Sequence, residues 1–188
     1  MRPQPVRTGI IQMIYYKPIK EAQINIEMFR CFNRYQKVSK CWRKDNKGWT
    51  LKDIPFIKNW NADDLSHLVS CLKQTAAAGG AVIGAFADDD LVGFSSIESG
   101  FFGEQQQYLQ LSNLHVSHEY RSLGIGKTLF LLSADKAREM GAKKLYISAH
   151  SSEETQAFYK AMHCIEAQEY NQKLAEAEPC DCQLEFIL

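Results

Sequence analysis

The chain has 188 residues, of which 45% are apolar and 23% are charged. This length is enough to bury a sizeable core, and the composition is that of an ordinary globular protein. The 22 lysines and arginines balance 22 aspartates and glutamates. No overall charge therefore favours nucleic acid or an anionic membrane, and we expect neither as a partner.

The N-terminus and the cysteines bear on location. The apolar run from Ile10 to Tyr16 is too short for a signal-peptide core, and no stretch approaches the length of a membrane span. The six cysteines contain no C-x-x-C pair. We therefore expect reduced thiols, a cytoplasmic protein and no metal site.

The N-terminal part is predicted to contain a strand and two helices. The strand covers Ile10 to Tyr15, and the first helix covers Lys20 to Ser39, where apolar residues recur at helical spacing. Residues 41–61 are rich in tryptophan and charge and contain glycine and proline breakers, so we expect an irregular segment. A second helix begins near Asp63 and ends before Gly79, a strong helix stop.

The middle of the chain is predicted to form a hairpin, a strand and a helix. Ala81 to Phe86 and Leu91 to Ser99 are two strands around an acidic turn. After a connection rich in glycine and glutamine, a third strand covers Tyr108 to Val116. A tight turn then leads into an amphipathic helix that ends at Gly141, a suitable C-terminal cap.

The C-terminal part is predicted to contain three strands and a helix. A strand covers Lys143 to His150, and a capping box of Ser151 and Glu154 begins the helix. Two further strands cover Ile165 to Tyr170 and Asp181 to Leu188. The alternating side chains of the last strand suit either a buried position or one shared across a homodimer.

The turn that follows Val116 carries the strongest chemical signal. Arg121, Gly124 and Gly126 lie where several unpaired backbone N–H groups meet at the positive end of a helix. The glycines allow the main chain to approach an anion closely. The turn therefore predicts a phosphate-binding site.

Residue spacing distinguishes three phosphate-binding patterns. A P-loop needs a glycine five residues before Gly126, where this chain has Arg121. A dinucleotide fingerprint needs a third glycine where this chain has Leu129. Residues 121–126 satisfy every position of the third pattern, Q/R-x-x-G-x-G/A.

With this pattern, the chain resembles the GNAT N-acetyltransferase superfamily. Leu111, Leu114 and Val116 match the run that precedes the turn, and residues 157–159 match a second family region, so the resemblance covers about residues 81–170. It implies the α+β class, with a three-layer arrangement and a GNAT-type mixed, mostly antiparallel sheet that has helices on both faces. It also implies acetyl-CoA as the cosubstrate.

The resemblance implies how the coenzyme is held within one domain of residues 1–188. The backbone of residues 121–127 would bind the pyrophosphate, and residues 114–116 would pair with the pantetheine arm beside a bulge or splay in the sheet. A later helix would add further contacts. The expected coenzyme contacts are Leu114, His115, Val116, Arg121, Ser122, Leu123, Gly124, Ile125, Gly126, Lys127, Thr128, Ser152, Thr155 and Phe158.

The resemblance also implies catalytic roles. Tyr159 matches the tyrosine that the family often uses as general acid for the leaving thiolate. For the general base, which the sequence does not single out, Glu98 at a strand end is the first candidate and His115 the second. The chain departs from the family pattern at Ser152, where asparagine is common, and at His163-Cys164, where Gly-Phe is common.

The resemblance places the acceptor against residues 17–80, which are rich in aromatic side chains. Core packing explains most of these, and a sharper hypothesis is that three tryptophans line a pocket for an amine. Arg30 and Arg34 are alternatives that would bind a carboxylate, although a solvated helix face explains them equally well. The tryptophans are Trp42, Trp49 and Trp60.

We therefore expect an N-acetyltransferase that transfers the acetyl group of acetyl-CoA to a primary amine of a small molecule or an amino acid-like metabolite. One alternative is a catalytically weak acyl-CoA-binding sensor or interaction module of the same fold. A second alternative is a nucleotide-binding protein, since Gly126-Lys127-Thr128 mimics the end of a P-loop.

Overall fold

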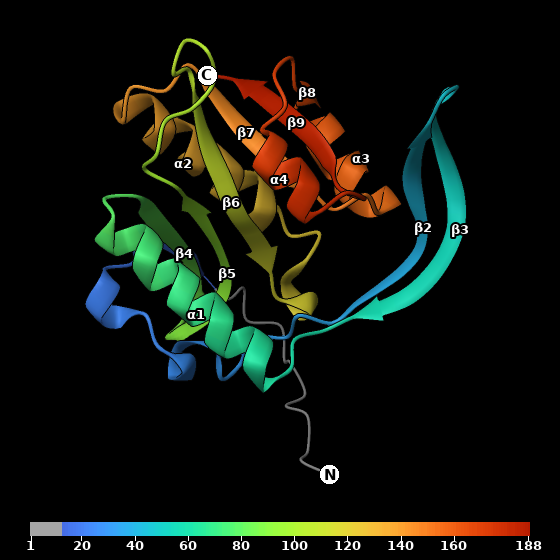
Figure 1. Cartoon of the computed structure of the whole chain (residues 1–188). Coiled ribbons are helices and arrows are strands. Elements are labelled where there is room, and N and C mark those ends of the chain that lie inside the picture. Colours follow the sequence, from blue (N-terminus) through green and yellow to red (C-terminus); the bar gives the residue numbers. More distant parts are fainter. Residues whose placement is uncertain (1–12) are drawn as a thin grey trace.

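A mixed seven-stranded sheet organises the structure, a computed structural model that describes residues 13–188 (Figure 1). The strand order is β1-β4-β5-β6-β7-β9-β8. Every neighbouring pair in this sheet is antiparallel except β6 and β7, as the predicted fold class requires. The strands are β1 (Ile14–Pro18), β4 (Ala81–Ala87), β5 (Asp90–Ile97), β6 (Tyr108–Val116), β7 (Lys144–Ala149), β8 (Ile165–Glu166) and β9 (Cys182–Ile187).

Helices cover both faces of the sheet, which confirms the predicted layers. In Figure 1, α1 lies in front of the sheet and α2 behind it. Tyr159 of α3 packs with Phe130 of α2, whereas Leu174 of α4 packs on the opposite face of the sheet against Tyr108 and Tyr146. The α-helices are α1 (Ala62–Ala77), α2 (Ile125–Glu139), α3 (Glu153–Ala161) and α4 (Gln172–Ala177). The short 3-10 turns are η1 (Glu21–Gln23), η2 (Ile26–Phe29) and η3 (His118–Tyr120).

The predicted elements from α1 to β7 are confirmed within a few residues. Asn61 caps α1 in a capping box with Asp64. The hairpin of β4 and β5 and the bounds of β6 agree with the sequence pattern. Helix α2 ends before Gly141, whose φ of +97° is the left-handed conformation that favours glycine. Local signals were sufficient in this part of the chain.

The predicted first strand and first helix need correction. The strand runs from Ile14 to Pro18, and residues 10–12 of the prediction lie outside the described residues. The helix over residues 20–39 is wrong, because η1 and η2 are followed by a strand that starts at Gln36. The side chains of Asn25 and Asn33 accept hydrogen bonds from nearby backbone N–H groups, which competes with helix formation.

Residues 41–61 are not irregular, since most of them belong to a long hairpin. It consists of β2 (Gln36–Asp45) and β3 (Gly48–Lys58), and its turn is held by the Asp45 carboxylate, which accepts from the Lys47 N–H at 2.8 Å. Gly48, with φ of +111°, ends the turn. The pairing register shifts opposite Pro55, so this proline lies in a bulge, a position that strands tolerate.

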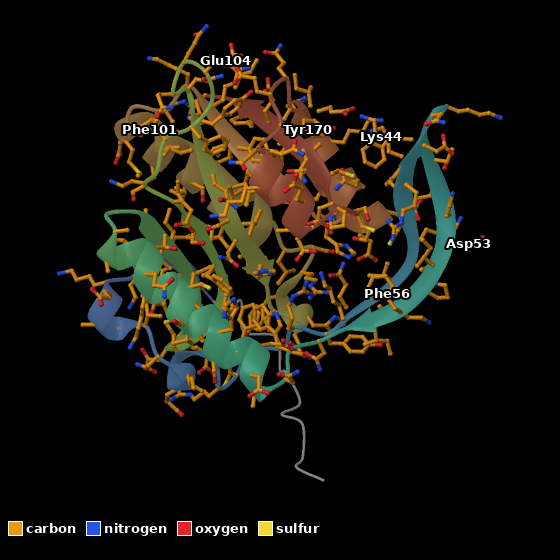
Figure 2. All side chains as sticks on the ribbon, viewed as in Figure 1. Lys44, Asp53, Phe56, Phe101, Glu104 and Tyr170 are labelled. Carbon is orange, nitrogen blue, oxygen red and sulfur yellow. The ribbon has the colours of Figure 1, made fainter. Side chains whose placement is uncertain are left out.

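The hairpin extends away from the sheet and contacts the body through β2 (Figure 1). The Trp42 N–H donates to the Ser151 carbonyl oxygen at 2.8 Å, and Nη1 of Arg43 donates to the Ser151 hydroxyl at 2.7 Å. Lys44 forms an ion pair with Glu166 and lies 5.7 Å from the centre of the Tyr170 ring (Figure 2). These contacts fix the hairpin beside α3 and β8.

The C-terminal predictions were partly wrong. Ser152, and not Ser151, caps α3, and its side chain accepts from the Thr155 N–H without the predicted capping box. The strand predicted over residues 165–170 is reduced to Ile165–Glu166, and α4 was missed. Strand β9 lies between β7 and β8, inside the sheet. Of the two positions that its alternating side chains allowed, the buried one is therefore correct, and β9 is not an edge strand shared across a dimer.

The sheet splays beside the second half of β6, as the resemblance implied. Parallel pairing of β6 with β7 covers Tyr108–Gln110 and Lys144–Tyr146 and then stops. On the other side, the register between β5 and β6 shifts at Ser96, which places a bulge at Ser112. Beyond Gln110 the two strands separate, and this separation opens the sheet.

Within residues 13–188, no helix is both long and apolar enough to cross a membrane.

A buried ion pair lies at the end of the sheet where β6 and β7 pair with each other. The Glu185 side chain is 0% exposed, and it accepts hydrogen bonds from Nζ of Lys144 at 2.8 Å, from the Tyr108 hydroxyl and from the Gln168 N–H at 3.0 Å. Burial alone would raise the pKa of Glu185, but these hydrogen bonds lower it below its usual value. The carboxylate thus stays charged inside the protein because three donors satisfy it.

We expect Lys144→Met to lower the free energy of unfolding at pH 7 by about 3 kcal/mol, because it leaves a buried charge without its cation. A lowered carboxyl pKa contributes stability above the usual pKa near 4.5 and loses it as the pH falls through the folded-state value. The difference in the free energy of unfolding between Lys144→Met and the unmodified protein should therefore become smaller in acid. Urea unfolding at several pH values measures it, with the exposed neighbour Lys143→Met as control. An equal loss in both variants would contradict the assignment.

Candidate active site

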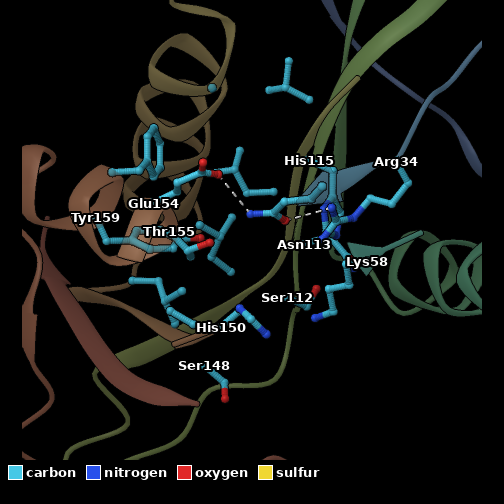
Figure 3. A pocket seen from close by; sticks show the side chains of 18 of the residues that line it. Arg34, Lys58, Ser112, Asn113, His115, Ser148, His150, Glu154, Thr155 and Tyr159 are labelled. Carbon is cyan, nitrogen blue, oxygen red and sulfur yellow. Dashed lines mark hydrogen bonds between the residues drawn. The ribbon is translucent and has the colours of Figure 1, made fainter. Parts of the chain in front are cut away.

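The splay between β6 and β7 forms one large cleft of about 1560 Å³ (Figure 3). Its walls come from both strands, from α1, from the N-termini of α2 and α3, and from the base of the β2–β3 hairpin. Figure 3 shows side chains from β6, β7, α3 and the hairpin base converging on the same space. Segments far apart in the sequence therefore meet at one site.

The N-terminus of α2 lies uncapped at the edge of the cleft, and we call the backbone N–H groups of residues 124–127 the cradle. Gly124 is the N-cap with φ of +81°, and no side chain caps the helix. The first acceptor within the helix, the Gly124 carbonyl, receives the Thr128 N–H at 3.0 Å. The N–H groups of residues 124–127 therefore have no partner within the helix and stay available to an anion. This geometry fits a pyrophosphate.

Arg121 shapes this cradle. Its Nε donates to the Val116 carbonyl oxygen at 3.1 Å, and its Nη2 donates to the Arg34 carbonyl oxygen at 3.4 Å. Burial lowers the pKa of its guanidinium, and the nearby carboxylates of Glu154 and Glu119 oppose that change. The arginine thus ties the turn to the end of β6, which keeps the cradle facing the cleft.

Most of the expected coenzyme contacts line the cleft, and four side chains do not. Leu123 is exposed, Ile125 lies in the core and Thr128 donates its hydroxyl to the Gly124 carbonyl oxygen. Ser152 is buried as the cap of α3. The expected contacts that do line the cleft are Leu114, His115, Val116, Arg121, Ser122, Gly124, Gly126, Lys127, Thr155 and Phe158.

Tyr159 lies at the α3 wall of the cleft, almost fully buried. Burial raises the pKa of its phenol, and the neighbouring Cys164 and Asp181 add to the increase. Within residues 13–188 its hydroxyl forms no hydrogen bond. The phenol is therefore protonated at neutral pH and can donate to an incoming group.

Glu98 lines the cleft beyond the end of β5. Its Oε1 accepts from the hydroxyl of Thr75 at 2.8 Å and from the hydroxyl of Ser112, the bulge residue. Its Oε2 accepts no hydrogen bond from residues 13–188. One oxygen therefore orients the carboxylate, and the other is available to accept a proton.

His115 is held on the α1 side of β6. Its ring lies 5.1 Å from the Trp60 ring and 5.3 Å from the Phe94 ring. Burial lowers the pKa of His115 well below its usual value, and Arg34, Lys58 and Arg121 lower it further. The imidazole is therefore neutral and is a weaker base than an ordinary histidine.

The sequence did not point to Asp181, a second carboxylate in the cleft. Burial and the neighbouring Glu178 raise the pKa of Asp181 to about 6, while Lys58 and Arg43 oppose the increase. A carboxylate of this kind can accept a proton near neutral pH. It lies just before β9, where no local motif marks it.

His150 and Lys58 were also missed. His150 follows β7, and burial together with Lys58, Arg34 and Arg43 lowers its pKa to about 4. Lys58 ends β3 and has a lowered pKa because of burial and the nearby Arg34. Both residues line the cleft, although the sequence suggested only an irregular segment at residue 58.

The acceptor-side hypotheses are only partly supported. Of the three tryptophans, Trp60 alone lines the cleft, whereas Trp49 donates its indole N–H to Glu166 at the far end of the hairpin. Arg30 is exposed and pairs with Asp90 at 3.1 Å, outside the cleft. Arg34 lies inside the cleft.

No cluster of three or more histidine, cysteine, aspartate or glutamate residues that could hold a metal ion occurs in residues 13–188.

Comparison with known proteins gives the family. Residues 39–163 match the family model described as "Acetyltransferase (GNAT) family", which is more than half of the chain. The chain therefore belongs to the GNAT acetyltransferase family. A search of curated proteins found no match.

Solved structures with low sequence identity share the fold. A candidate streptothricin acetyltransferase from Bacillus anthracis str. Ames, in complex with acetyl coenzyme A, has a TM-score of 0.70 at 12% identity and covers 94% of this chain and 99% of its own. Nourseothricin acetyltransferase has a TM-score of 0.61 at 18% identity, with 92% and 95% covered. The PaiA N-acetyltransferase from Thermoplasma acidophilum, in complex with coenzyme A, has a TM-score of 0.58 at 13% identity, with 94% and 99% covered.

We expect Gly124→Glu to weaken coenzyme A binding about 100-fold or more. An added Cβ at Gly124 meets nothing within 4 Å, so the side chain is accommodated, but it places a negative charge at the cradle. The positive φ adds strain of about 1–2 kcal/mol. Isothermal titration calorimetry with coenzyme A measures the affinity.

Gly141→Glu is the matched control for this change. Gly141 also has a positive φ and open space, but it follows the opposite end of α2. It should bind coenzyme A with unchanged affinity. Equal affinity for coenzyme A in the two variants would contradict the expectation that the N-terminus of α2 binds the coenzyme.

Proposed function

We propose that the protein is an acetyl-CoA-dependent N-acetyltransferase that acts on a primary amine of a small molecule or an amino acid-like metabolite. The observation that carries this proposal is the uncapped N-terminus of α2, which opens into the same cleft as Tyr159 and Glu98. Family membership and two fold neighbours crystallised with acetyl coenzyme A or coenzyme A support the choice of cosubstrate.

The proposed binding mode uses backbone groups. The N–H groups of residues 124–127 bind the pyrophosphate, and the β7-facing edge of residues 114–116 is available to the pantetheine arm because the pairing of β6 with β7 has ended. The side chains of Thr155 and Phe158, which line the cleft from α3, are proposed to contact the coenzyme as well. Bound acetyl-CoA supplies the acetyl group as a thioester.

The proposed chemistry assigns one proton transfer to each of two residues. Glu98, through its unengaged Oε2, accepts the proton that the amine loses as the C–N bond forms. Tyr159 donates a proton or hydrogen bond to the sulfur as the C–S bond breaks. The hydrogen bonds from Thr75 and Ser112 keep Glu98 in position.

The acceptor side is proposed to lie against residues 17–80. Helix α1 contributes His67, Leu68 and Cys71 to the cleft, and the hairpin base contributes Lys58. We also propose a cytoplasmic location, which the six free cysteines support because reduced thiols are typical there.

We expect Tyr159→Phe to lower kcat about 100-fold while the KM for acetyl-CoA changes little. The hydroxyl makes no hydrogen bond within residues 13–188, so thermal unfolding should be nearly unchanged. Thiol release over a panel of amines measures the rate. If the unmodified protein binds coenzyme A but releases thiol with no amine, the binding-only alternative replaces the enzyme.

We expect Glu98→Gln to lower kcat about 100-fold or more and Asp181→Asn to lower it less than about tenfold. The pH profile distinguishes the two carboxylates. A base with a pKa of about 6 would give a kcat/KM that rises through pH 6 and then levels, and Asp181→Asn would remove this rise. If Asp181→Asn removes the rise and costs more activity than Glu98→Gln, then Asp181 is the base and the assignment of Glu98 is wrong.

A further inference from the structure

The base of the β2–β3 hairpin places two cationic side chains in the cleft. Lys58 pairs with Gln36 in the hairpin register, and Arg34 precedes that pair by two residues. Both line the cleft, and Figure 3 shows them close together beside His115 and Asn113. The two cations therefore form one local group, which we call the hairpin-base cations.

Arg34 forms no ion pair with a carboxylate within residues 13–188. Its Nη1 donates to the neutral Oε1 of Gln36 at 3.0 Å, and its guanidinium lies 5.7 Å from the centre of the Trp60 ring. Its Nε is buried and has no hydrogen-bond partner among the described residues. Burying a charged donor without a partner costs free energy, and an anion bound to the part of the guanidinium that lines the cleft would offset this cost.

Lys58 also forms no ion pair among the described residues, although the carboxylates of Asp181 and Glu178 are near enough to oppose the lowering of its pKa by burial and Arg34. The six ion pairs within residues 13–188 use other cations, so neither Arg34 nor Lys58 forms one. Burial and the nearby Arg121 together lower the pKa of Arg34 to about 10. The two cations in turn lower the pKa of His115 and of His150. Arg34 itself lines the cleft, with a buried Nε that has no hydrogen-bond partner among the described residues.

The Arg34 guanidinium lies on a different face of β6 from the helix that forms the cradle. Leu114 and Val116 pack with Ile125 of α2, so these side chains point to the α2 face. His115, between them, points to the α1 face, where Trp60 and then Arg34 lie against it. The guanidinium is thus on the acceptor side, although the Arg34 carbonyl oxygen contacts Arg121.

Carboxylates line the same cleft, and one of them, Asp181, interacts electrostatically with Lys58. Glu98 follows β5 and Asp181 precedes β9, and neither forms an ion pair within residues 13–188. Acidic groups attract an ammonium, and the hairpin-base cations attract an anion. The cleft therefore suits a molecule that carries both charges.

We propose that the acceptor carries an anionic group, a carboxylate or a phosphate, in addition to its amine, and that Arg34 and Lys58 bind this group. This inference rests on the proposed N-acetyltransferase function and names the substrate class of that site. Polycationic amines would be repelled by the same two side chains. The hairpin, whose base supplies both cations, is then an element of acceptor specificity.

Direct anion binding tests the site without turnover. The protein is saturated with coenzyme A and titrated by calorimetry with succinate and with inorganic phosphate, so that the coenzyme cradle is already occupied. We expect one of these anions to bind, and Arg34→Met to weaken its binding about tenfold or more, as the loss of a charge-assisted hydrogen bond predicts. The matched control is Arg30→Met, since Arg30 is exposed and lies outside the cleft, and it should bind like the unmodified protein. If neither anion binds, or if both variants bind alike, the proposal is overturned.

Matched amines test the substrate class. Thiol release is compared for leucine and isopentylamine, for phenylalanine and phenethylamine, and for serine, O-phosphoserine and ethanolamine. We expect the acid-bearing member to have the higher kcat/KM, and Arg34→Met and Lys58→Met each to reduce that preference about tenfold, chiefly through the acceptor KM. Lys52→Met, on an exposed part of β3, is the control for Lys58. Preference for the amines without an acid would contradict the proposal.

The coenzyme phosphates are the other source of an anion. If Arg34 and Lys58 served them, Arg34→Met would raise the KM for acetyl-CoA about tenfold and leave the acceptor KM unchanged, which would overturn the acceptor site. Failure of the proposed function gives a different result. In that case no amine releases thiol, while anion binding to the coenzyme-saturated protein still depends on Arg34.

Discussion

The short parallel pairing between β6 and β7 is the constraint on which the rest of the site depends. Three residues of each strand pair, and the buried contacts of Glu185 with Lys144 and Tyr108 hold that end together. Beyond Gln110 the strands separate, while β6 stays paired with β5. One edge of β6 is thereby exposed to the cleft, and the turn that follows β6 presents the helix N-terminus to the same space.

The charges around the cleft follow from how the hairpin is anchored. Contacts of Trp42 and Arg43 with Ser151 fix β2 beside α3, so the two ends of the hairpin return to the cleft at Gln36 and Lys58. The cleft therefore contains both cations and carboxylates, with Lys58 near enough to Asp181 to affect its pKa. Tyr159 stays protonated because burial disfavours its charged form.

Local sequence signals predicted the part of the fold from α1 to β7, and they failed where tertiary contacts decided the conformation. The stripe of apolar residues over 20–39 has helical spacing, yet Ile24, which follows η1, and Phe29 of η2 are buried in the core under α1. Asn33 is held by the hydroxyl of Ser117, a contact across 84 positions that spacing does not reveal. Gly48 and Pro55 were interpreted as breakers, although one ends a hairpin turn and the other lies in a bulge.

The sequence by itself determined the tight turn after β6 and the uncapped N-terminus of α2, because both depend on neighbouring residues, and the spacing of Arg121, Gly124 and Gly126 specifies both. It also pointed to Tyr159 and Glu98, which the tertiary structure brings to the same cleft. Only the tertiary structure decided that Asp181 and Lys58 join them and that Arg34, but not Arg30, faces the cleft. The physical reason is that burial and long-range charge set the chemistry of a side chain, and both arise only when distant segments pack together.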